Sequence, residues 1–195
     1  EESEILQRID RTVSELHLKP LMNRSLFDLS GGQKQKIACA SVAVTGNKII
    51  LLDEPSANLD LQTIDELAEL LKKWKKEGKT IIVAEHRISY LWELADRTVI
   101  LSDGKIVREL SRLQMNKISE EELHGLGLRS ARHPELVSGS HTQEMLKQVQ
   151  HDTQQFQHDE SLTLQNFRYK YKNGYLALDI PQMQIPVGKI TAITG

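Results

Sequence analysis

Two short segments combine residue types that suit chemistry on a phosphate, and the first is Ser30-Gly31-Gly32-Gln33, which runs directly into a predicted helix. Glycines at a helix start let a ligand approach the backbone, and the free N–H groups and dipole of that helix end favour an anion. Ser30 adds a hydroxyl donor beside them. The segment therefore predicts a phosphate-binding helix N-terminus, and the alternative is a capped turn with flexible glycines.

The second segment is Asp53-Glu54, which follows the apolar run of residues 49–52 and precedes Pro55. A carboxylate at the tip of a buried strand lies where ligands bind in open α/β sheets. Asp53 there can hold Mg²⁺, directly or through water. Glu54 is placed to polarise a water for in-line attack on a γ-phosphate. A solvated loop is the alternative, and the apolar run and the proline weigh against it.

One histidine and one further aspartate complete the set of candidates. His86 follows the apolar segment of residues 80–84, so its strand tip and that of Asp53 are expected to open onto one crevice. A histidine there can hydrogen-bond a γ-phosphate or the attacking water, although a lone histidine is more often structural. Asp60 is a plausible N-cap for the helix that follows it.

These residues need a framework of alternating helices and strands, which the hydrophobic periodicity of the first 110 residues predicts. Such alternation favours a parallel sheet covered on both faces, and the unbroken apolar run 49–52 predicts a strand buried on both faces. Asp103-Gly104 predicts a tight hairpin. The expected helices are 3–18, 31–45, 61–76 and 87–95, and the expected strands are 49–52, 80–84, 99–101 and 105–107.

The composition is that of an ordinary globular protein, with 39% apolar and 27% charged residues and a net charge of -2. It excludes collagen-like, coiled-coil and fully disordered chains. No apolar run approaches the roughly 20 residues of a membrane span. The near-zero net charge gives no support for a nucleic-acid partner. The single Cys39 cannot form an internal disulfide, which fits a reducing cytosol.

The composition shifts near residue 111, and residues 129–160 read as a linker with little capacity to build a core. Strand-like alternation returns at residues 162–171 and 176–180, and a further strand at 190–194 runs into Gly195. A metal site in the linker is disfavoured because its histidines lack the tight pairs of structural zinc sites. Those histidines are His133, His141, His151 and His158.

The linker also suggests a hypothesis about its origin. Residues 135–138 can be encoded by a stretch whose reverse complement encodes residues 146–149, so the two segments could be the arms of one nucleotide hairpin. This arrangement resembles an in-frame palindromic repeat inserted in a gene, at a position where insertion disturbs folding least. Unmatched codons in the two arms of the gene would contradict the hypothesis.

Four segments, in this order, resemble the ATP-binding-cassette (ABC) ATPases. Residues 29–33, Leu-Ser-Gly-Gly-Gln, are similar to the family's signature, and residues 49–54 to its Walker B strand. Residues 56–60 are similar to its D-loop, and His86 to its switch histidine. The resemblance implies an α/β P-loop NTPase (ABC ATPase) three-layer fold, present in incomplete form, with a C-terminal antiparallel β segment of a second cassette.

The resemblance also implies an organisation into three parts. Residues 1–110 are expected to be the C-terminal part of a first cassette without its central strand, residues 111–160 the linker, and residues 161–195 the start of a second cassette. The chain begins at Glu1 and stops at the first glycine of a Walker A pattern, so we expect an internal piece of a longer polypeptide that is inactive alone.

The site residues follow from the same resemblance. Two cassettes of the family enclose two ATP molecules, each held by the Walker motifs of one cassette and the signature of the other. Asp53 would hold Mg²⁺, Glu54 would be the catalytic base, and His86 would sense the γ-phosphate. Asp60 would couple the two sites, and Tyr171 would stack on adenine, with a strand-edge packing role as its alternative. Ser30, Gly31, Gly32 and Gln33 would bind the γ-phosphate of ATP in the opposite cassette.

The function that this resemblance implies is ATP binding and hydrolysis in a membrane importer of the energy-coupling-factor type. Glu85-His86-Arg87 and the tandem arrangement favour that subtype. The expected partners are a second cassette and transmembrane transporter subunits, without nucleic acid, and the expected location is the cytoplasmic face of the membrane. The alternatives are a soluble ABC ATPase acting on ribosomes or DNA, and a nucleotide-binding regulator without turnover.

Overall fold

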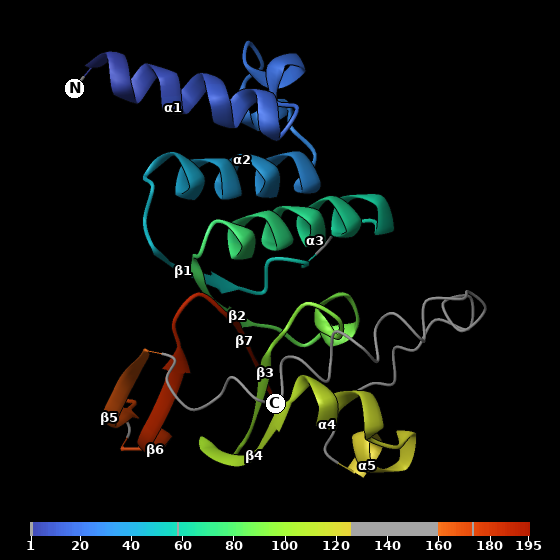
Figure 1. Cartoon of the computed structure of the whole chain (residues 1–195), viewed down its shortest axis with the longest axis vertical. Coiled ribbons are helices and arrows are strands. Elements are labelled where there is room, and N and C mark those ends of the chain that lie inside the picture. Colours follow the sequence, from blue (N-terminus) through green and yellow to red (C-terminus); the bar gives the residue numbers. More distant parts are fainter. Residues whose placement is uncertain (1, 58, 126–159, 173) are drawn as a thin grey trace.

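The structure, a computed structural model, describes residues 2–57, 59–125, 160–172 and 174–195, and it has three layers (Figure 1). A five-stranded sheet forms the middle layer, with helices on one face and a two-stranded hairpin on the other. Among the described residues, no helix is both long and apolar enough to cross a membrane. The predicted α/β fold is confirmed, and packed apolar residues lie on both faces of the sheet.

The central sheet has the strand order β1-β2-β7-β3-β4. Its first four strands are parallel: β1 (Ile49–Asp53), β2 (Thr80–Ala84), β7 (Ile190–Thr194) and β3 (Arg97–Ser102). The last strand, β4 (Lys105–Ser111), pairs antiparallel with β3. A strand near the C-terminus of the chain therefore fills the centre of the sheet, a position that we expected to be vacant.

Three helices lie on one side of this sheet, α1 (Glu2–Glu15), α2 (Gly31–Val44) and α3 (Leu61–Lys76), and α1 packs on α2 as the outermost of them (Figure 1). All three were predicted, and α3 ends before Gly78, whose φ of +76° suits glycine. The largest cluster of buried residues joins apolar side chains of α2, α3 and the segment after α1 to one side of the parallel strands. Its members that are fully or almost fully buried include Leu71, Trp74, Ile50, Ile81, Val83, Ile190 and Ala192.

The other face of the sheet is covered by the antiparallel hairpin of β5 (Ser161–Lys170) and β6 (Leu176–Pro186). Side chains of β6 pack against β3, and a second buried cluster joins Ile180, Met183 and Ile185 to Val99. The β3–β4 turn reaches the same hairpin, because the N–H of Asp179 donates to the carbonyl of Gly104 at 2.8 Å. A Cβ on Gly104 would lie 2.2 Å from the carbonyl oxygen of Ala177, so this predicted turn requires glycine.

The packed core includes residues beyond position 110. Residues 112–125, which we assigned to the linker, form α4 (Arg112–Lys117) and α5 (Glu120–Gly125). Their apolar side chains pack against Ile100 of β3, Leu110 of β4 and the nearby Ile88, so this stretch contributes to the core. The cluster comprises Met115, Ile118, Leu123, Ile88, Ile100 and Leu110. The linker histidines and the hypothetical repeat arms lie outside the described residues.

Two predicted elements differ from the observed ones. β1 is the edge strand of the sheet and is not buried on both faces, because Ile49 is 45% exposed and Leu51 is 69% exposed. An unbroken apolar run cannot distinguish a central strand from an edge strand that lacks cover on one face. Residues 87–95, predicted as a helix, contain only the short 3-10 helix η3 (Ile88–Leu91). Two further 3-10 turns, η1 (Lys19–Leu21) and η2 (Leu26–Asp28), lie between α1 and α2.

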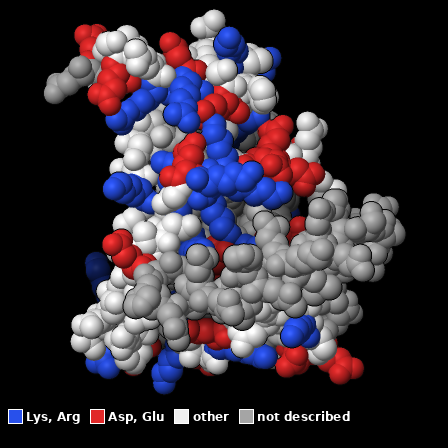
Figure 2. Space-filling model, viewed as in Figure 1, with Lys and Arg blue, Asp and Glu red and all other residues white. Residues whose placement is uncertain are grey.

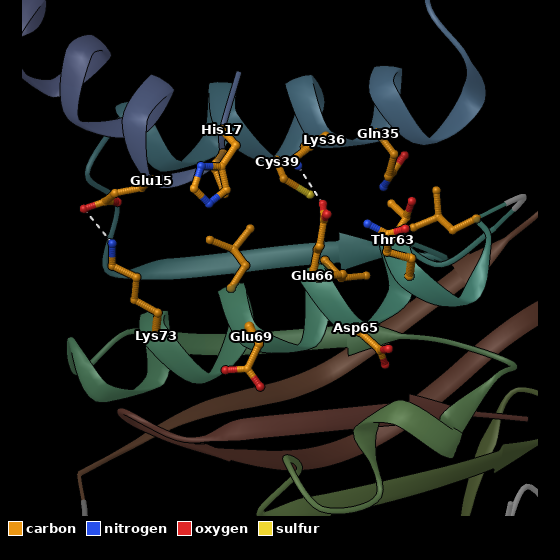
Figure 3. Close-up of a pocket in the computed structure, with 15 residues that line it drawn as sticks. Glu15, His17, Gln35, Lys36, Cys39, Thr63, Asp65, Glu66, Glu69 and Lys73 are labelled. Carbon is orange, nitrogen blue, oxygen red and sulfur yellow. Dashed lines mark hydrogen bonds and ion pairs between the residues drawn. The ribbon is translucent and has the colours of Figure 1, made fainter. Parts of the chain in front are cut away.

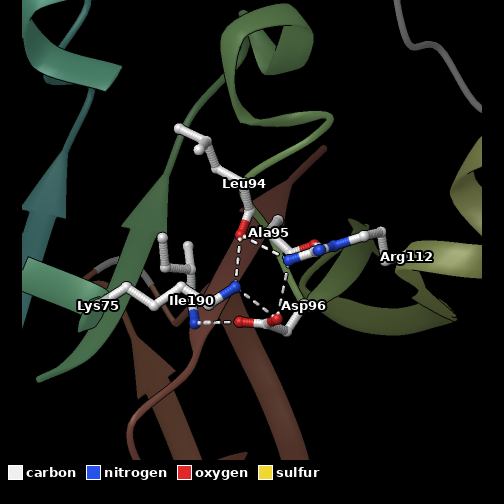
Figure 4. Close-up of polar contacts among 6 residues, drawn as sticks. All are labelled: Lys75, Leu94, Ala95, Asp96, Arg112 and Ile190. Atoms are coloured by element: carbon white, nitrogen blue, oxygen red, sulfur yellow. Dashed lines mark hydrogen bonds and ion pairs between the residues drawn. The ribbon is translucent and has the colours of Figure 1, made fainter. Parts of the chain in front are cut away.

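Asp96 holds the start of β7 in register (Figure 4). Its Oδ2 accepts the N–H of Ile190 at 2.9 Å, and its own N–H donates to the carbonyl of Ile190 at 2.9 Å. The other carboxylate oxygen pairs with Lys75 Nζ of α3 at 2.6 Å and with Arg112 Nη2 of α4 at 3.0 Å. Burial lowers the pKa of Lys75, and the nearby Asp96 carboxylate opposes that shift.

Replacing Asp96 with Asn is expected to destabilise the fold by about 2 kcal/mol, because the charge that serves Lys75, Arg112 and the Ile190 N–H is lost in a partly buried site. Urea unfolding of the 195-residue chain measures the change in the free energy of unfolding. Asp65→Asn, on an exposed position of α3, is the matched control and should change it by less than about 0.5 kcal/mol. Equal effects of the two substitutions would contradict the role of Asp96.

Candidate active site

The carboxyl ends of β1, β2 and β7 open onto one cavity of about 800 Å³. The β3–β4 turn and part of β6 close its other sides. The structure thus brings Asp53, Glu54 and His86 to a common crevice, as we expected from their positions at strand ends. The residues at the ends of these three strands that line it include Asp53, Glu54, Glu85, His86, Thr194 and Gly195.

Glu54 has an unusual backbone conformation for a residue with a side chain. Its φ is +43°, in the left-handed region that residues other than glycine rarely adopt. Two hydrogen bonds hold it there: its N–H donates to the carbonyl of Ala84 at 2.9 Å, and its carbonyl accepts from the N–H of Ala57 at 3.0 Å. Local strain of this kind persists only where the surroundings enforce it, and it is frequent at functional sites.

This conformation brings Glu54 and His86 together. Glu54 Oε1 lies 3.3 Å from His86 Nε2, and both side chains are more than half exposed to the cavity and solvent. A carboxylate and an imidazole at this distance can share contact with one water or one phosphate oxygen. The pair can therefore orient a water molecule for attack and accept its proton.

Asp53 contributes the adjacent carboxylate of the cavity wall. Among the described residues, no group of three or more His, Cys, Asp or Glu side chains could hold a metal ion. Mg²⁺ fits this donor set, because it is commonly bound through one or two carboxylates together with substrate phosphates and waters. Asp53 could supply one carboxylate of this kind.

Glu85 is a site residue that the sequence analysis noted only as part of a subtype pattern. Its carboxylate is buried beneath the cavity, with the residue only 5% exposed, and it accepts hydrogen bonds from both loops of the site. A charged residue directly after a strand of buried apolar residues was the available signal, because buried carboxylates need several donors. Gly195, directly after β7, lies close to the neighbouring strand β3: a Cβ on this residue would lie 2.1 Å from the Leu101 carbonyl oxygen.

The signature segment begins α2 with a capping box. Ser30 Oγ accepts the N–H of Gln33 at 3.3 Å, and Gln33 Oε1 accepts the N–H of Ser30 at 3.1 Å. This confirms the capped turn, and it leaves the Ser30 hydroxyl hydrogen and the Gln33 side-chain NH₂ as donors. Capping and anion binding at this helix start are therefore compatible.

Asp60 lies beside the signature segment rather than in the cavity. Its Oδ1 accepts the N–H of Thr63 at 2.8 Å and caps α3, as predicted. Gly32 packs against the same threonine, since a Cβ built there would lie 3.3 Å from Thr63 Oγ1. Hydrogen bonds from the side chain and backbone of Thr63 hold the pKa of Asp60 below its ordinary value.

The predicted residues therefore fall into separate groups. Asp53, Glu54 and His86 line the cavity, whereas Ser30–Gln33 and Asp60 meet at Thr63 and do not line it. Tyr171 lies on a third surface, at the end of the β5–β6 hairpin, with its ring edge-on to Tyr169 at 5.1 Å and stacked on Tyr175 at 6.3 Å between centroids. The two neighbouring tyrosines were not singled out from the sequence.

A second hollow, of about 480 Å³, lies between α2 and α3 (Figure 3). Ion pairs bridge it at two points, Lys36 Nζ with Glu66 Oε2 at 2.6 Å and Lys73 Nζ with Glu15 Oε1 at 2.5 Å. Cys39 of α2 also lines it, and burial raises the pKa of this thiol to about 11 and keeps it protonated. This hollow holds none of the predicted site residues.

The sheet order, the acidic strand tip and the glycine-led helix define a P-loop NTPase of the ABC ATPase type. A family model described as "ABC transporter" matches residues 1–57. A Treponema denticola protein assigned as an ABC transporter ATP-binding protein is 36% identical over 195 residues, which are 100% of this chain and 38% of that protein. The chain belongs to the family of ABC transporter ATP-binding cassettes.

Solved structures agree with this assignment. CbiO1 from Clostridium perfringens, described as part of the ABC transporter complex cbiONQ, matches with a TM-score of 0.55 and 30% identity over 66% of this chain and 51% of that one. A dimeric ATP-binding cassette in a post-hydrolysis state, bound to ADP and Pi, matches with a TM-score of 0.50 and 30% identity over 54% of this chain and 46% of that one. The chain thus spans about half or less of these relatives.

The cap at Asp60 makes the stability of the chain dependent on pH. Because the folded-state pKa of Asp60 is depressed, its contribution is present above its unfolded-state pKa and is lost as pH falls through the folded-state value. Asp60→Asn keeps a capping oxygen that does not titrate. Urea midpoints measured from neutral pH down through the carboxyl range should fall more steeply for the wild type than for the variant. Parallel curves would contradict the assignment.

Proposed function

We propose that this chain is part of the ATP-hydrolysing subunit of an ABC transporter. The observation that carries the proposal is the contact of Glu54 with His86, 3.3 Å apart, in the cavity onto which β7 runs. Membership of the ABC cassette family supports ATP as the substrate whose γ-phosphate the cavity receives. A regulator without turnover would not require a carboxylate in this position.

Each cavity residue then has a distinct part in hydrolysis. Asp53 would hold Mg²⁺, which supplies positive charge to the phosphates when it is bound. Glu54 would orient the attacking water and accept its proton, and His86 would hydrogen-bond the γ-phosphate or that water. The reaction depends chiefly on positioning and on electrostatic stabilisation of charge that develops in the transition state.

The separation of the signature segment from the cavity supports an arrangement of two cassettes. The signature donors of Ser30–Gln33 do not line the cavity of this chain, so they would serve an ATP held by a facing cassette. Asp60, which meets the signature at Thr63, would couple the two sites. The solved relative that is described as dimeric supports pairing of this kind.

The division of the chain between two cassettes is also part of the proposal. Residues 161–195 would begin the second cassette, with Tyr171 stacking on adenine and β7 leading into its Walker A loop. The first unit would include α4 and α5, since they pack on β3. In this proposal β7, which lies between β2 and β3 in this chain, would be a strand of the second cassette that takes the central position in the sheet of the first.

The transporter subtype follows from weaker resemblances. An importer of the energy-coupling-factor type is favoured by Glu85-His86-Arg87 and by the likeness to cbiO1, which is described as part of the cbiONQ complex. In this proposal transmembrane subunits are the partners, and the cassette lies at the cytoplasmic face of the membrane. Figure 2 shows basic and acidic side chains intermingled over the described part of one face, which does not favour nucleic acid.

Glu54→Gln in the full-length protein is expected to keep ATP binding and to lower ATP turnover on the order of 10²-fold or more, because the amide cannot accept the proton of the attacking water. Glu93→Gln, at an exposed position outside the cavity, is the matched control and should leave turnover unchanged. Measurement of ATP binding and phosphate release tests both variants. Undiminished turnover in Glu54→Gln at both sites would contradict the base assignment.

Affinity purification of the full-length protein in detergent is expected to recover a membrane-embedded partner. A transporter subunit must transmit closure of the cassettes to a protein that spans the bilayer, whereas a soluble ABC ATPase acting on ribosomes or DNA has no such requirement. Mass spectrometry of the purified complex makes the distinction. Recovery of ribosomal proteins or nucleic acid without any membrane-spanning subunit would favour the alternative function.

A further inference from the structure

Glu85 connects the two loops that carry Glu54 and His86. Its Oε1 accepts the backbone N–H groups of His86 at 3.0 Å and Arg87 at 3.1 Å, which fixes the loop after β2. Its Oε2 accepts the N–H of Ser56 at 3.2 Å, which fixes the turn after β1. The hydroxyl of Tyr90 donates to the same Oε2 at 3.1 Å. One carboxylate thus contacts both sides of the proposed site.

Because Glu85 is buried, the loss of any of these hydrogen bonds would cost more free energy than it would at the surface. The residue is only 5% exposed, and a buried carboxylate needs several donors to offset the loss of its hydration. Three of its four donors are backbone N–H groups of the two site loops, and hydrogen bonds to a charged acceptor are stronger than neutral ones. Burial and the negative charge of Glu85 also raise the pKa of Tyr90, so its hydroxyl stays protonated as a donor.

We propose that Glu85 is a positioning residue for ATP hydrolysis, which sets the distance between the Glu54 carboxylate and the His86 imidazole. This inference rests on the proposed function, but its structural part is independent of it. Glu54 precedes the Ser56 turn by two residues, and His86 is itself bonded to Glu85 through its backbone. Without the shared carboxylate, the Ser56 N–H would remain buried and unpaired, and the two loops would lose their common anchor.

The test uses Glu85→Gln in the full-length protein, because glutamine has the same size but replaces one acceptor oxygen with an NH₂ group. One loop must then lose its acceptor. Amide hydrogen exchange is expected to rise about tenfold or more in residues 53–57 or 85–88, as for a lost hydrogen bond to a charged group, while β2 keeps its protection. Glu85→Ala is the second variant and should free both loops. Unchanged exchange in both variants would overturn the proposal.

Tyr90→Phe is the matched control, because it removes one donor from Oε2 and leaves all three loop N–H groups bonded. It should leave hydrogen exchange in the two loops unchanged. An increase equal to that of Glu85→Gln would overturn the proposal by showing general loosening of the loops.

In ATPase assays, Glu85→Gln should lower kcat by roughly tenfold to a hundredfold with little change in KM, as for a displaced catalytic group. A rise in KM at constant kcat would also overturn it.

The exchange and turnover measurements separate the two proposals. If the wild type does not hydrolyse ATP, the proposed function fails, and exchange still decides whether Glu85 anchors both loops. If the wild type hydrolyses ATP and Glu85→Gln retains full kcat, only the positioning role fails. A loss of kcat that matches a lower unfolding midpoint at the assay temperature would equally reject positioning, because the variant would then simply be less folded.

Discussion

The pairing of β7 between β2 and β3 is the constraint on which the rest of the structure depends. This strand supplies backbone hydrogen bonds to both neighbours, and its apolar side chains enter the cores on both faces of the sheet. Asp96 anchors its first residue through the Ile190 N–H and draws Lys75 and Arg112 to the same point. If β7 were absent, the strands β2 and β3 would have no common partner. The helical layer would also lose part of the apolar surface on which it packs.

The candidate site follows from this arrangement because parallel strands deliver their carboxyl ends to one edge. Asp53, His86 and Gly195 come from distant parts of the sequence, and only the adjacent positions of β1, β2 and β7 place them around one cavity. The finer geometry depends on two local features. The left-handed backbone of Glu54 turns its carboxylate toward His86, and the buried Glu85 holds the loops on both sides.

The separation of the signature segment from the cavity has a physical basis in the packing of α2. Its first turn is fixed by the Ser30–Gln33 capping box and by contact with Thr63 at the start of α3. The N-terminus of α2 therefore lies beside the start of α3 and not at the cavity of its own chain. A donor surface and an acidic cavity that do not meet within one chain are compatible with a site completed by a second cassette.

The sequence by itself determined the helices α1, α2 and α3, the β3–β4 turn at Asp103-Gly104, and the strand-end positions of the cavity residues. Local rules were sufficient there, because caps, glycine turns and hydrophobic periodicity act over a few residues. Tertiary structure alone decided that β1 is an edge strand with Leu51 exposed, and that residues 112–125 pack on β3. It also decided the placement of β7 and the double role of Glu85, because both depend on contacts between segments far apart in the chain.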